Sequence, residues 1–364
     1  MLFWLFQLKE FSIIFNLFRY ITFRASMAAV TTFVLCLLLG NLFIKKYKHF
    51  LQEKVKRSDA PQLDQFQKSK EGIPTMGGIF IVGSIVISVL LWADLTNPFI
   101  ILTLLTCVWL AGVGLWDDYI KLRNKETKKG QRGLTKRTKL LWQILIGCIV
   151  GVFVYLDPGT STQLDIPFTK SLVIDLGIFY IPFVALIVIG TSNAVNFTDG
   201  LDGLAIGCVL MASIGLAILC YLTGNIKICE YLLIPHIPFS GELTVFCTAI
   251  IGASLGFLWF NCFPATVFMG DVGSLALGGI LGIIAVLIKK ELLLIILGGV
   301  FVIEALSVIL QIIYFKVTHK RFFKMSPFHH HLQLSGWNES KIIVRFWILA
   351  IIFVLLTLTT LKLR

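Results

Sequence analysis

The chain has 364 residues, of which 57% are hydrophobic and only 14% are charged, and its mean hydropathy is +0.88. This composition excludes an ordinary soluble domain, because such domains carry about 25% charged residues. A net charge of +12 would suit a nucleic-acid partner in a soluble protein. Here the positions of the basic residues indicate a membrane protein instead, and no nucleic-acid partner is expected.

Long apolar segments follow one another along the chain and predict membrane-spanning helices. A run of about 20 apolar residues crosses the hydrocarbon core, where a helix satisfies its own backbone hydrogen bonds. Ten segments qualify: 25–44, 74–93, 98–116, 138–156, 172–191, 201–223, 243–262, 270–288, 291–315 and 342–361. The expected fold is an all-α integral membrane protein of about ten transmembrane helices, formed by a single domain over residues 1–364. Residues 1–24 lack the basic start of a signal peptide and are expected to form an N-terminal interfacial helix.

Lys and Arg gather in alternate loops. Loops 45–73, 117–139 and 316–341 hold eight, nine and five of them, whereas the loops of opposite parity hold four in total. Because cytoplasmic loops are enriched in Lys and Arg, the three basic loops are predicted to face the cytoplasm and both termini the outer side. A basic face of this kind suits anionic membrane lipid and anionic substrate.

Two adjacent acids, Asp117 and Asp118, follow the apolar residues 110–116 and open the most basic loop. They could simply end a helix beside Lys and Arg. However, a helix C-terminus carries partial negative charge and disfavours acids. An Asp at bilayer depth also costs roughly 2.5–3.5 kcal/mol. The pair therefore indicates metal binding or base chemistry.

A group of amides and acids lies at the start of the 201–223 segment. Asn196, Asp199 and Asp202 are spaced by three residues, so near-helical geometry would place them on one face, and Asn193 precedes them. Gly200 would let a ligand approach the backbone closely. A helix N-cap explains one of the acids, but it does not explain two acids with two amides.

Asp271 stands at the start of another apolar segment, within Phe268-Met-Gly-Asp-Val-Gly-Ser274. It could be only a helix N-cap, but the flanking glycines and Ser274 suit a phosphate or metal site at a helix N-terminus. Phe268 could stack on a base or anchor the helix at the membrane interface.

Three consecutive histidines, His329, His330 and His331, lie in the third basic loop. Neighbours in sequence rarely all face one metal, so zinc binding is disfavoured. A solvated loop and hydrogen bonds to a pyrophosphate both stay open from spacing alone.

Glu304, Ser307 and Gln311 share one face of an apolar segment. A buried Glu inside a span indicates a functional site. An interhelical hydrogen bond is the alternative.

Apart from the Glu304 face, all these motifs fall on the predicted cytoplasmic side. Carboxylates hold Mg²⁺, Lys and His offset phosphate charge, and Asn and Phe can recognise a base. The combination predicts metal-assisted phosphoryl transfer at a membrane surface, and a lipid acceptor would explain the membrane location.

These motifs, with segment 70–78 and Ser307-Val-Ile-Leu-Gln311, resemble those of the polyprenyl-phosphate N-acetylhexosamine-1-phosphate transferases. The resemblance runs in order from about Ile21 to the C-terminus. The triple His with the following Leu-Ser-Gly-Trp337 favours the branch of the family that uses a muramoyl-pentapeptide donor over the N-acetylglucosamine branch.

The resemblance implies a reaction in which UDP-N-acetylmuramoyl-pentapeptide donates its phospho-sugar to undecaprenyl phosphate. The products would be lipid I and UMP, Mg²⁺ would be required, and the reaction would be the first membrane step of peptidoglycan synthesis. The resemblance also implies ten spans, a cytoplasmic active site and a homodimer in the bacterial plasma membrane.

Residue roles carried over from the family are likewise expectations. Asp271 is implied to hold Mg²⁺ and Asp117 to deprotonate the lipid phosphate, with Asp118 close by at the metal and phosphates. His330 completes the implied catalytic set. The implied uridine-site positions are Lys70, Thr75, Asn193, Asn196, Asp199, Gly200 and Asp202, with Phe268 stacking on uracil. The implied phosphate and sugar contacts are His329, His330 and His331, with Gln311 lining the pocket and either Lys136 or Lys139 as the loop lysine.

Two mechanisms stay open, namely direct attack by the lipid phosphate and a covalent intermediate on an Asp. Direct attack is favoured, because a carboxylate among other acids suits metal or base work better than attack on an anionic diphosphate. A sister enzyme using UDP-N-acetylglucosamine and a transporter are the rival interpretations. The triple His disfavours the first, and the gathering of polar motifs at one face disfavours the second.

Overall fold

A computed structural model describes residues 1–10, 12–47, 70, 72–123, 133–157, 161–167 and 173–362. The described chain is mostly helical, as expected for an all-α membrane protein. Its elements are η1 (Leu2–Glu10), η2 (Ile13–Arg19), α1 (Ile21–Tyr47), α3 (Gly78–Trp92), α4 (Pro98–Arg123), α5 (Lys136–Leu156), β1 (Gln163–Asp165), β2 (Val173–Asp175), η3 (Gly177–Phe179), α6 (Tyr180–Thr198), α7 (Leu204–Thr223), α8 (Ile226–Leu232), η4 (Ser240–Glu242), α9 (Leu243–Asn261), α10 (Gly270–Leu287), α11 (Leu293–Leu297), α12 (Gly299–Thr318), α13 (Phe328–Leu334), α14 (Glu339–Thr359) and η5 (Thr360–Lys362).

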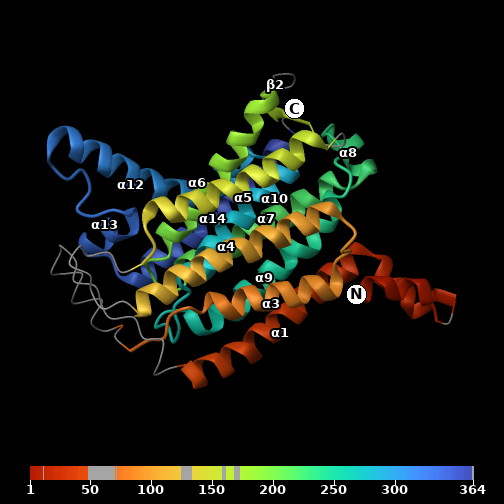
Figure 1. Cartoon of the computed structure of the whole chain (residues 1–364), viewed down its shortest axis with the longest axis horizontal. Coiled ribbons are helices and arrows are strands. Elements are labelled where there is room, and N and C mark those ends of the chain that lie inside the picture. Colours follow the sequence, from red (N-terminus) through yellow and green to blue (C-terminus); the bar gives the residue numbers. More distant parts are fainter. Residues whose placement is uncertain are drawn as a thin grey trace.

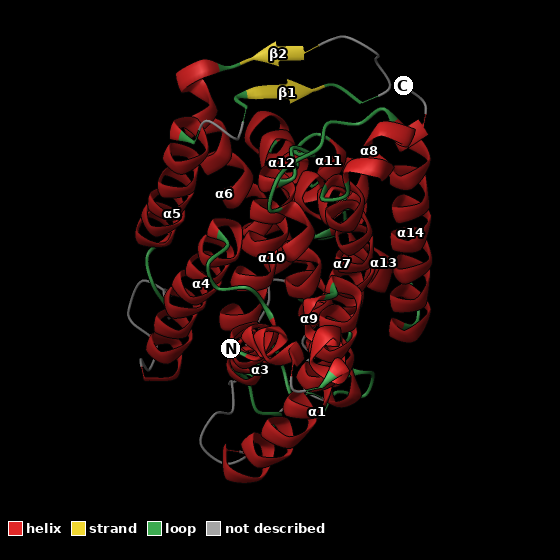
Figure 2. Ribbon diagram, turned by 90° about the vertical axis from the view of Figure 1, so that its right-hand side faces the viewer, coloured by secondary structure: helices red, strands yellow, loops and turns green. Residues whose placement is uncertain are grey.

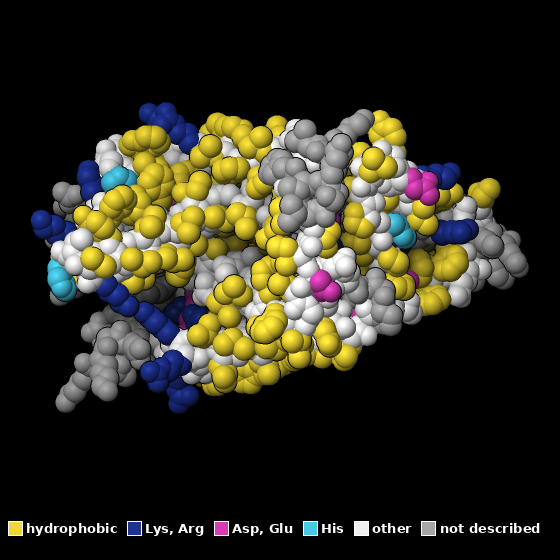
Figure 3. All heavy atoms as spheres, turned by 90° about the horizontal axis from the view of Figure 1, so that it is seen from above, with side chains coloured by type: hydrophobic (Ala, Val, Ile, Leu, Met, Phe, Trp, Pro, Cys, Tyr) yellow, Lys and Arg dark blue, Asp and Glu magenta, His cyan; other side chains and the backbone are white. Residues whose placement is uncertain are grey.

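The long helices form one bundle around α10 (Figure 1). Helix α10 packs against α3, α4, α6 and α7, and 89% of its apolar span is buried inside the protein. Helix α12 lies at the edge of the bundle, where only 22% of its span is buried. Hydrophobic side chains cover the middle of the face in Figure 3, and its Lys and Arg lie toward the two ends. This is the surface expected of a bundle that crosses a membrane.

Nine helices in the described ranges are long and apolar enough to span a membrane, against the ten segments predicted. The exception is α3, which has 15 residues and hence a length of about 22 Å. The predicted segment began at residue 74, but the chain from Pro74 to Gly77 is not helical, because it pairs with the segment before α10. Phe268 N donates to Pro74 O at 2.8 Å, and Gly77 N donates to Phe268 O at 2.8 Å.

Three further predictions differ from the structure. The N-terminal segment is not one interfacial helix, because it forms two short 3-10 helices, η1 and η2, before α1 begins at Ile21. The predicted 291–315 segment is divided into α11 and α12 at Gly298, whose N–H still bonds to Leu294 O at 2.7 Å. The predicted 172–191 segment begins with a strand, and its helix starts only at Tyr180.

Strands β1 and β2 form an antiparallel hairpin that lies across one end of the bundle (Figure 2). Leu164 pairs with Ile174 at its centre. Both chain ends lie toward this hairpin end of the bundle, whereas α13 lies toward the opposite end (Figure 1). The candidate catalytic residues described below gather at the α13 end.

Candidate active site

Three aspartates meet where α4 packs against α10. Asp117 and Asp118 belong to α4, which continues past them to Arg123 instead of ending at residue 116. Asp271 lies in the first turn of α10. One carboxylate oxygen from each residue lies within 4.8 Å of the other two, and Asp117 and Asp118 are only 1% and 4% exposed. The predicted catalytic and metal-binding acids are therefore brought together.

Two lysines lie among these carboxylates. The ammonium of Lys139, in α5, is 3.0 Å from Asp117 Oδ2 and 2.5 Å from Asp271 Oδ2. The ammonium of Lys121, in α4, is 2.7 Å from Asp117, 3.2 Å from Asp118 and 3.1 Å from Asp271. The cluster thus holds three carboxylates and two ammonium groups.

The family resemblance leaves Lys136 and Lys139 as alternatives, and Lys121 was not predicted. The structure places Lys139 in the cluster, while Lys136 is exposed at the start of α5. Lys121 follows Asp117 by four residues, the spacing at which side chains meet on a helix. That spacing could have identified it, had α4 been extended beyond residue 116.

Backbone groups fix the aspartates from several directions. Leu134 N donates to Asp117 Oδ1 at 2.6 Å, and Val272 N donates to Asp118 Oδ2 at 3.2 Å. Gly270 has φ +75°, and a Cβ there would lie 2.6 Å from Asp118 Oδ2 and 3.3 Å from Thr75 Oγ1. Only glycine fits this turn without strain, and its small size admits both side chains. Thr75 therefore lies beside the cluster of Asp117, Asp118 and Asp271, which we call the three-aspartate cluster.

The predicted amides separate into two environments at the end of α6. Asn196 Nδ2 donates to Asp271 Oδ1 at 2.9 Å and to Ser274 Oγ at 2.8 Å, so Asn196 contacts the three-aspartate cluster. Asn193 Nδ2 instead donates to Gln143 Oε1 at 3.0 Å, which joins α6 to α5. The expected single face of residues 196, 199 and 202 is broken, because α6 ends at Thr198 and α7 begins only at Leu204.

Asp202 lies in a second group of charges. Lys70 Nζ is 2.6 Å from Asp202 Oδ1 and 2.6 Å from Glu339 Oε1. Asp202 Oδ2 also accepts a hydrogen bond from Ala265 N at 3.0 Å. Asp199 is the C-cap residue of α6, and Phe268 is half-buried just before α10. Lys70 is thus paired with two carboxylates outside the three-aspartate cluster.

The three histidines point to three different places, because successive helix residues are rotated by about 100°. His329 is fully buried, and its N–H and Nδ1 lie 3.2 Å and 3.1 Å from the two carboxylate oxygens of Glu304. His330 Nδ1 lies 2.8 Å from Gln333 Oε1. His331 Nδ1 accepts from Lys324 N at 3.2 Å, and its ring stacks on Phe328.

Glu304 therefore has a partner, His329, that was not predicted from the sequence. The other ring nitrogen of His329, Nε2, is buried without a hydrogen-bond partner in the described structure. A Cβ at position 200 would lie 2.3 Å from that nitrogen. Gly200 is thus required for the packing of His329, and a substrate contact by His329 would need this ring to become exposed.

His330 is the histidine whose surroundings most clearly affect its charge. Burial, the neighbouring His329 and the positive charge of Lys70 lower the pKa of His330 to about 3, although the contact with Gln333 acts in the opposite direction. The ring is therefore neutral at physiological pH. Gln311 lies farther along α12, where its Oε1 accepts a hydrogen bond from Phe323 N at 2.9 Å.

The three-aspartate cluster has the donor set of a divalent-cation site. Carboxylate oxygens are hard ligands, and three neighbouring carboxylates repel one another unless positive charge lies among them. Lys121 and Lys139 supply that charge in this structure. Asp117, Asp118 and Asp271 could therefore hold a metal ion when the lysines shift toward an anionic substrate.

Comparison with known proteins finds family matches over the segments that carry these residues. The sequence model described as glycosyl transferase family 4 matches residues 100–289, which include all three aspartates. A signature described as phospho-N-acetylmuramoyl-pentapeptide-transferase signature 1 matches residues 70–82, which include Lys70 and Thr75.

Several curated relatives are similar along almost the whole chain. The phospho-N-acetylmuramoyl-pentapeptide-transferases of Desulforapulum autotrophicum and Desulfotalea psychrophila are 51% and 52% identical to it, with 96% of each chain covered. The protein of the same name from Methylacidiphilum infernorum is 47% identical, with 100% of both chains covered. The chain therefore belongs to the phospho-N-acetylmuramoyl-pentapeptide-transferase family, within glycosyl transferase family 4.

Proposed function

We propose that this protein transfers phospho-N-acetylmuramoyl-pentapeptide from its UDP carrier to undecaprenyl phosphate. The products are lipid I and UMP, and the reaction is the first membrane step of peptidoglycan synthesis. The observation that carries the proposal is the cluster of three aspartates, two of them buried, and two half-buried lysines at one end of a membrane bundle. The family membership supports the choice of substrates.

The chemistry is a direct displacement at phosphorus. An oxygen of the lipid phosphate attacks the phosphorus that carries the sugar, the P–O bond to the UMP leaving group breaks, and UMP departs with the bridging oxygen. Asp117 accepts the proton when the lipid phosphate arrives protonated. Because the transition state of phosphoryl transfer is loose, positioning and charge neutralisation supply most of the rate. Lys121 and Lys139 are placed to neutralise phosphate oxygens.

Mg²⁺ is the proposed metal, held by Asp271 with Asp117 and Asp118. When bound, it would neutralise charge on the diphosphate and stabilise the departing UMP. Asn196, which donates to Asp271, orients that carboxylate toward the cluster.

The remaining site residues are proposed to bind the donor. The uridine positions are Lys70, Thr75, Asn193, Asn196, Asp199, Gly200 and Asp202, with Phe268 stacking on uracil. Neutral His330 would hydrogen-bond the phosphate and sugar. His331 and Gln311 are proposed to contact the same part of the donor, and His329 would do so once its ring becomes exposed. An apolar cavity lined by Ile187, Val195, Phe301 and Ala305, between α6 and α12, suits the polyprenyl chain.

We also propose a location and an assembly. The excess of Lys and Arg in alternate loops favours a bacterial plasma membrane protein with the three-aspartate cluster toward the cytoplasm and both termini outside. A homodimer is expected from the family resemblance. Most of the basic residues of loop 45–73 lie outside the described residues.

The decisive experiment is UMP release by the purified protein in detergent, with Mg²⁺ and polyprenyl phosphate. The muramoyl-pentapeptide and N-acetylglucosamine UDP donors are tested side by side. Turnover of the muramoyl donor alone, lost with EDTA, is the expected result. Turnover of the other donor alone would assign the protein to the sister branch.

A further inference from the structure

Glu339, in the first turn of α14, is a carboxylate that the proposed mechanism does not use. Its Oε1 accepts from Lys70 Nζ at 2.6 Å and from Asp202 N at 3.1 Å. The Glu339 side chain is only 10% exposed. It therefore joins three segments that are distant in sequence, namely the chain before α3, the α6–α7 loop and the start of α14.

A favourable helix dipole does not account for this arrangement. An acid in the first turn of a helix is stabilised by the partial positive charge there. That effect needs no partner outside the helix, yet the Glu339 carboxylate reaches across to Lys70 and to the backbone of Asp202. The side chain is therefore held by other segments of the site.

The two carboxylates restrict the Lys70 ammonium. An ammonium group has three N–H donors, and two of them are directed at Asp202 and Glu339. Asp202 is itself fixed by Ala265 N. Within the described ranges, these two carboxylates are the acceptors of Lys70, so its third donor has a direction fixed by the other two.

We propose that Glu339 is a positioning residue for the nucleoside of the donor, acting through Lys70. This inference rests on the proposed function. Together with Asp202, Glu339 holds the ammonium so that its third N–H meets an oxygen of the uracil base.

The charge balance supports a neutral group as the ligand of Lys70. One lysine with two carboxylates leaves this group with a formal charge of −1, which repels a diphosphate. The three-aspartate cluster, by contrast, can gain a divalent cation to bind phosphate. A neutral carbonyl oxygen accepts a hydrogen bond from a restrained ammonium without adding negative charge.

The test compares Glu339→Gln, Lys70→Met and the double variant with the wild type. UMP affinity is measured by titration calorimetry, and KM is measured separately for the UDP donor and the lipid acceptor. Glu339→Gln is expected to weaken UMP binding and raise the donor KM by about tenfold, the effect of one hydrogen bond to a charged group. The acceptor KM and kcat should stay within about twofold. Glu230→Gln, which removes an exposed carboxylate from α8, is the matched control. It should change neither the UMP affinity nor the donor KM.

The double variant separates positioning from a merely structural role. If Glu339 acts through Lys70, Glu339→Gln has no further effect on UMP binding in the Lys70→Met background. Additive effects, or equal changes in the donor and acceptor KM, would overturn the proposal. If Glu339→Gln does not fold, Glu339→Asp keeps the charge but shifts the carboxylate, and an unchanged donor KM there contradicts the proposal. If the wild type binds UMP but turns over neither UDP donor, the proposed function is refuted. The UMP titrations of the Glu339 variants would still test the role of Glu339, because they do not depend on turnover.

Discussion

Two buried groups of charges lie at opposite ends of α10, about 27 Å apart, and they are built differently. At the N-terminal end, Asp271 meets two other aspartates and two lysines, so carboxylates outnumber ammonium groups. Just beyond the C-terminal end, each lysine has its own acid. Lys289 is 3.1 Å from Glu291, and Lys290 is 3.2 Å from Asp165.

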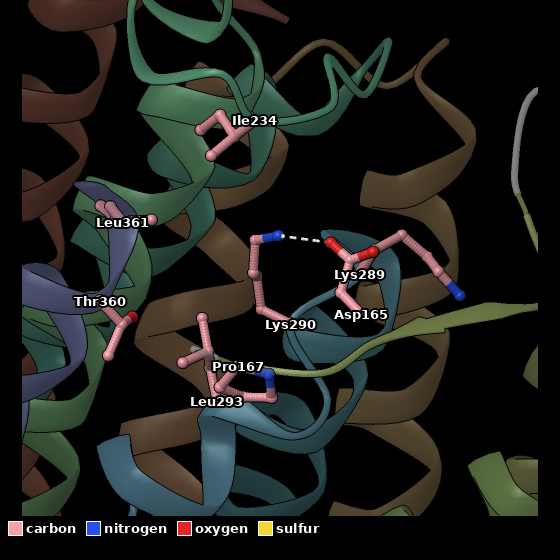
Figure 4. Close-up of a pocket in the computed structure, with 8 residues that line it drawn as sticks. All are labelled: Asp165, Pro167, Ile234, Lys289, Lys290, Leu293, Thr360 and Leu361. Carbon is pink, nitrogen blue, oxygen red and sulfur yellow. Dashed lines mark hydrogen bonds and ion pairs between the residues drawn. The ribbon is translucent and has the colours of Figure 1, made fainter. Parts of the chain in front are cut away.

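The second group, which we call the hairpin cluster, consists of Tyr180, Lys289, Lys290, Glu291 and Asp165. Tyr180 donates to Glu291 and accepts from Lys289 at 2.8 Å. Lys290 reaches Asp165 on strand β1 across a small cavity (Figure 4). These contacts attach the hairpin to the end of α10 and α11.

The difference favours a functional role for the three-aspartate cluster and a structural role for the hairpin cluster. Buried carboxylates that face one another cost free energy unless a cation joins them, so the three-aspartate cluster is suited to gaining and losing positive charge. The hairpin cluster is matched charge for charge and has no such need. An unbalanced set of like charges is therefore better evidence for a functional site than the burial of a charged group alone.

The largest effect should follow from removing the charge of Asp271. Asp271→Asn keeps the side-chain size but removes one carboxylate from the three. A metal ion contributes several kcal/mol to a phosphoryl-transfer transition state, so we expect turnover to fall on the order of 10³-fold or more. UMP release across a Mg²⁺ titration measures this. Near-full Mg²⁺-dependent activity in the variant would contradict the role of Asp271.

The sequence predicted the members of the three-aspartate cluster but not all of its contacts. Asp117, Asp118 and Asp271 stood out because acids are rare in so apolar a chain. Lys121 did not, because one lysine in a basic loop looks like any solvated lysine until the helix is known to continue. The separation of His329, His330 and His331 depends on their lying in a short helix, α13, which composition alone does not predict.

The sequence predicted which segments form helices, but it did not predict where several of these helices begin or break. Apolar length identified nine spans, since each must cross the same hydrocarbon thickness. The short α3 and the break at Gly298 depend on tertiary contacts, namely the pairing of the chain at Pro74–Gly77 with Phe268 and the packing around α11. The partner of Glu304 was likewise hidden, because His329 is 25 residues away in sequence.

A smaller effect is expected from Lys121→Met, which should strengthen Mg²⁺ binding but lower turnover. Removing this ammonium leaves three carboxylates with one lysine, so the cluster should bind Mg²⁺ at least about tenfold more tightly in the absence of substrate. Turnover should fall by about 10- to 100-fold, because one group that neutralises phosphate charge is lost. Calorimetric Mg²⁺ titration and UMP release give the two numbers. Weaker metal binding would show that Lys121 organises the aspartates instead of competing with the metal.

Tyr180→Phe should affect stability and leave catalysis unchanged. The variant leaves Glu291 and Lys289 buried without their shared hydroxyl, which costs about 1–3 kcal/mol and lowers the melting temperature in detergent by a few degrees. The donor kcat/KM should stay within about twofold. Tyr155→Phe, at a tyrosine that is 42% exposed, is the matched control. A large loss of turnover with unchanged stability would mean that the hairpin cluster is coupled to the three-aspartate cluster.

The smallest effect concerns stability at acid pH, which should be lost at the α13 end of the bundle. The pKa of His330 lies near 3 in the folded protein, well below its ordinary value of about 6.5. Between these values the unfolded chain binds a proton that the folded protein does not, so stability falls as the pH is lowered through this window and is constant above it. His330→Gln removes this contribution. The melting temperature of the wild type should therefore drop by a few degrees more than that of His330→Gln between pH 7.5 and pH 5.

His236→Gln, at an exposed histidine near the hairpin end, should behave like the wild type. Equal pH dependence in wild type and His330→Gln would show that His330 is not held neutral, and acid sensitivity would then have to be sought in the hairpin cluster.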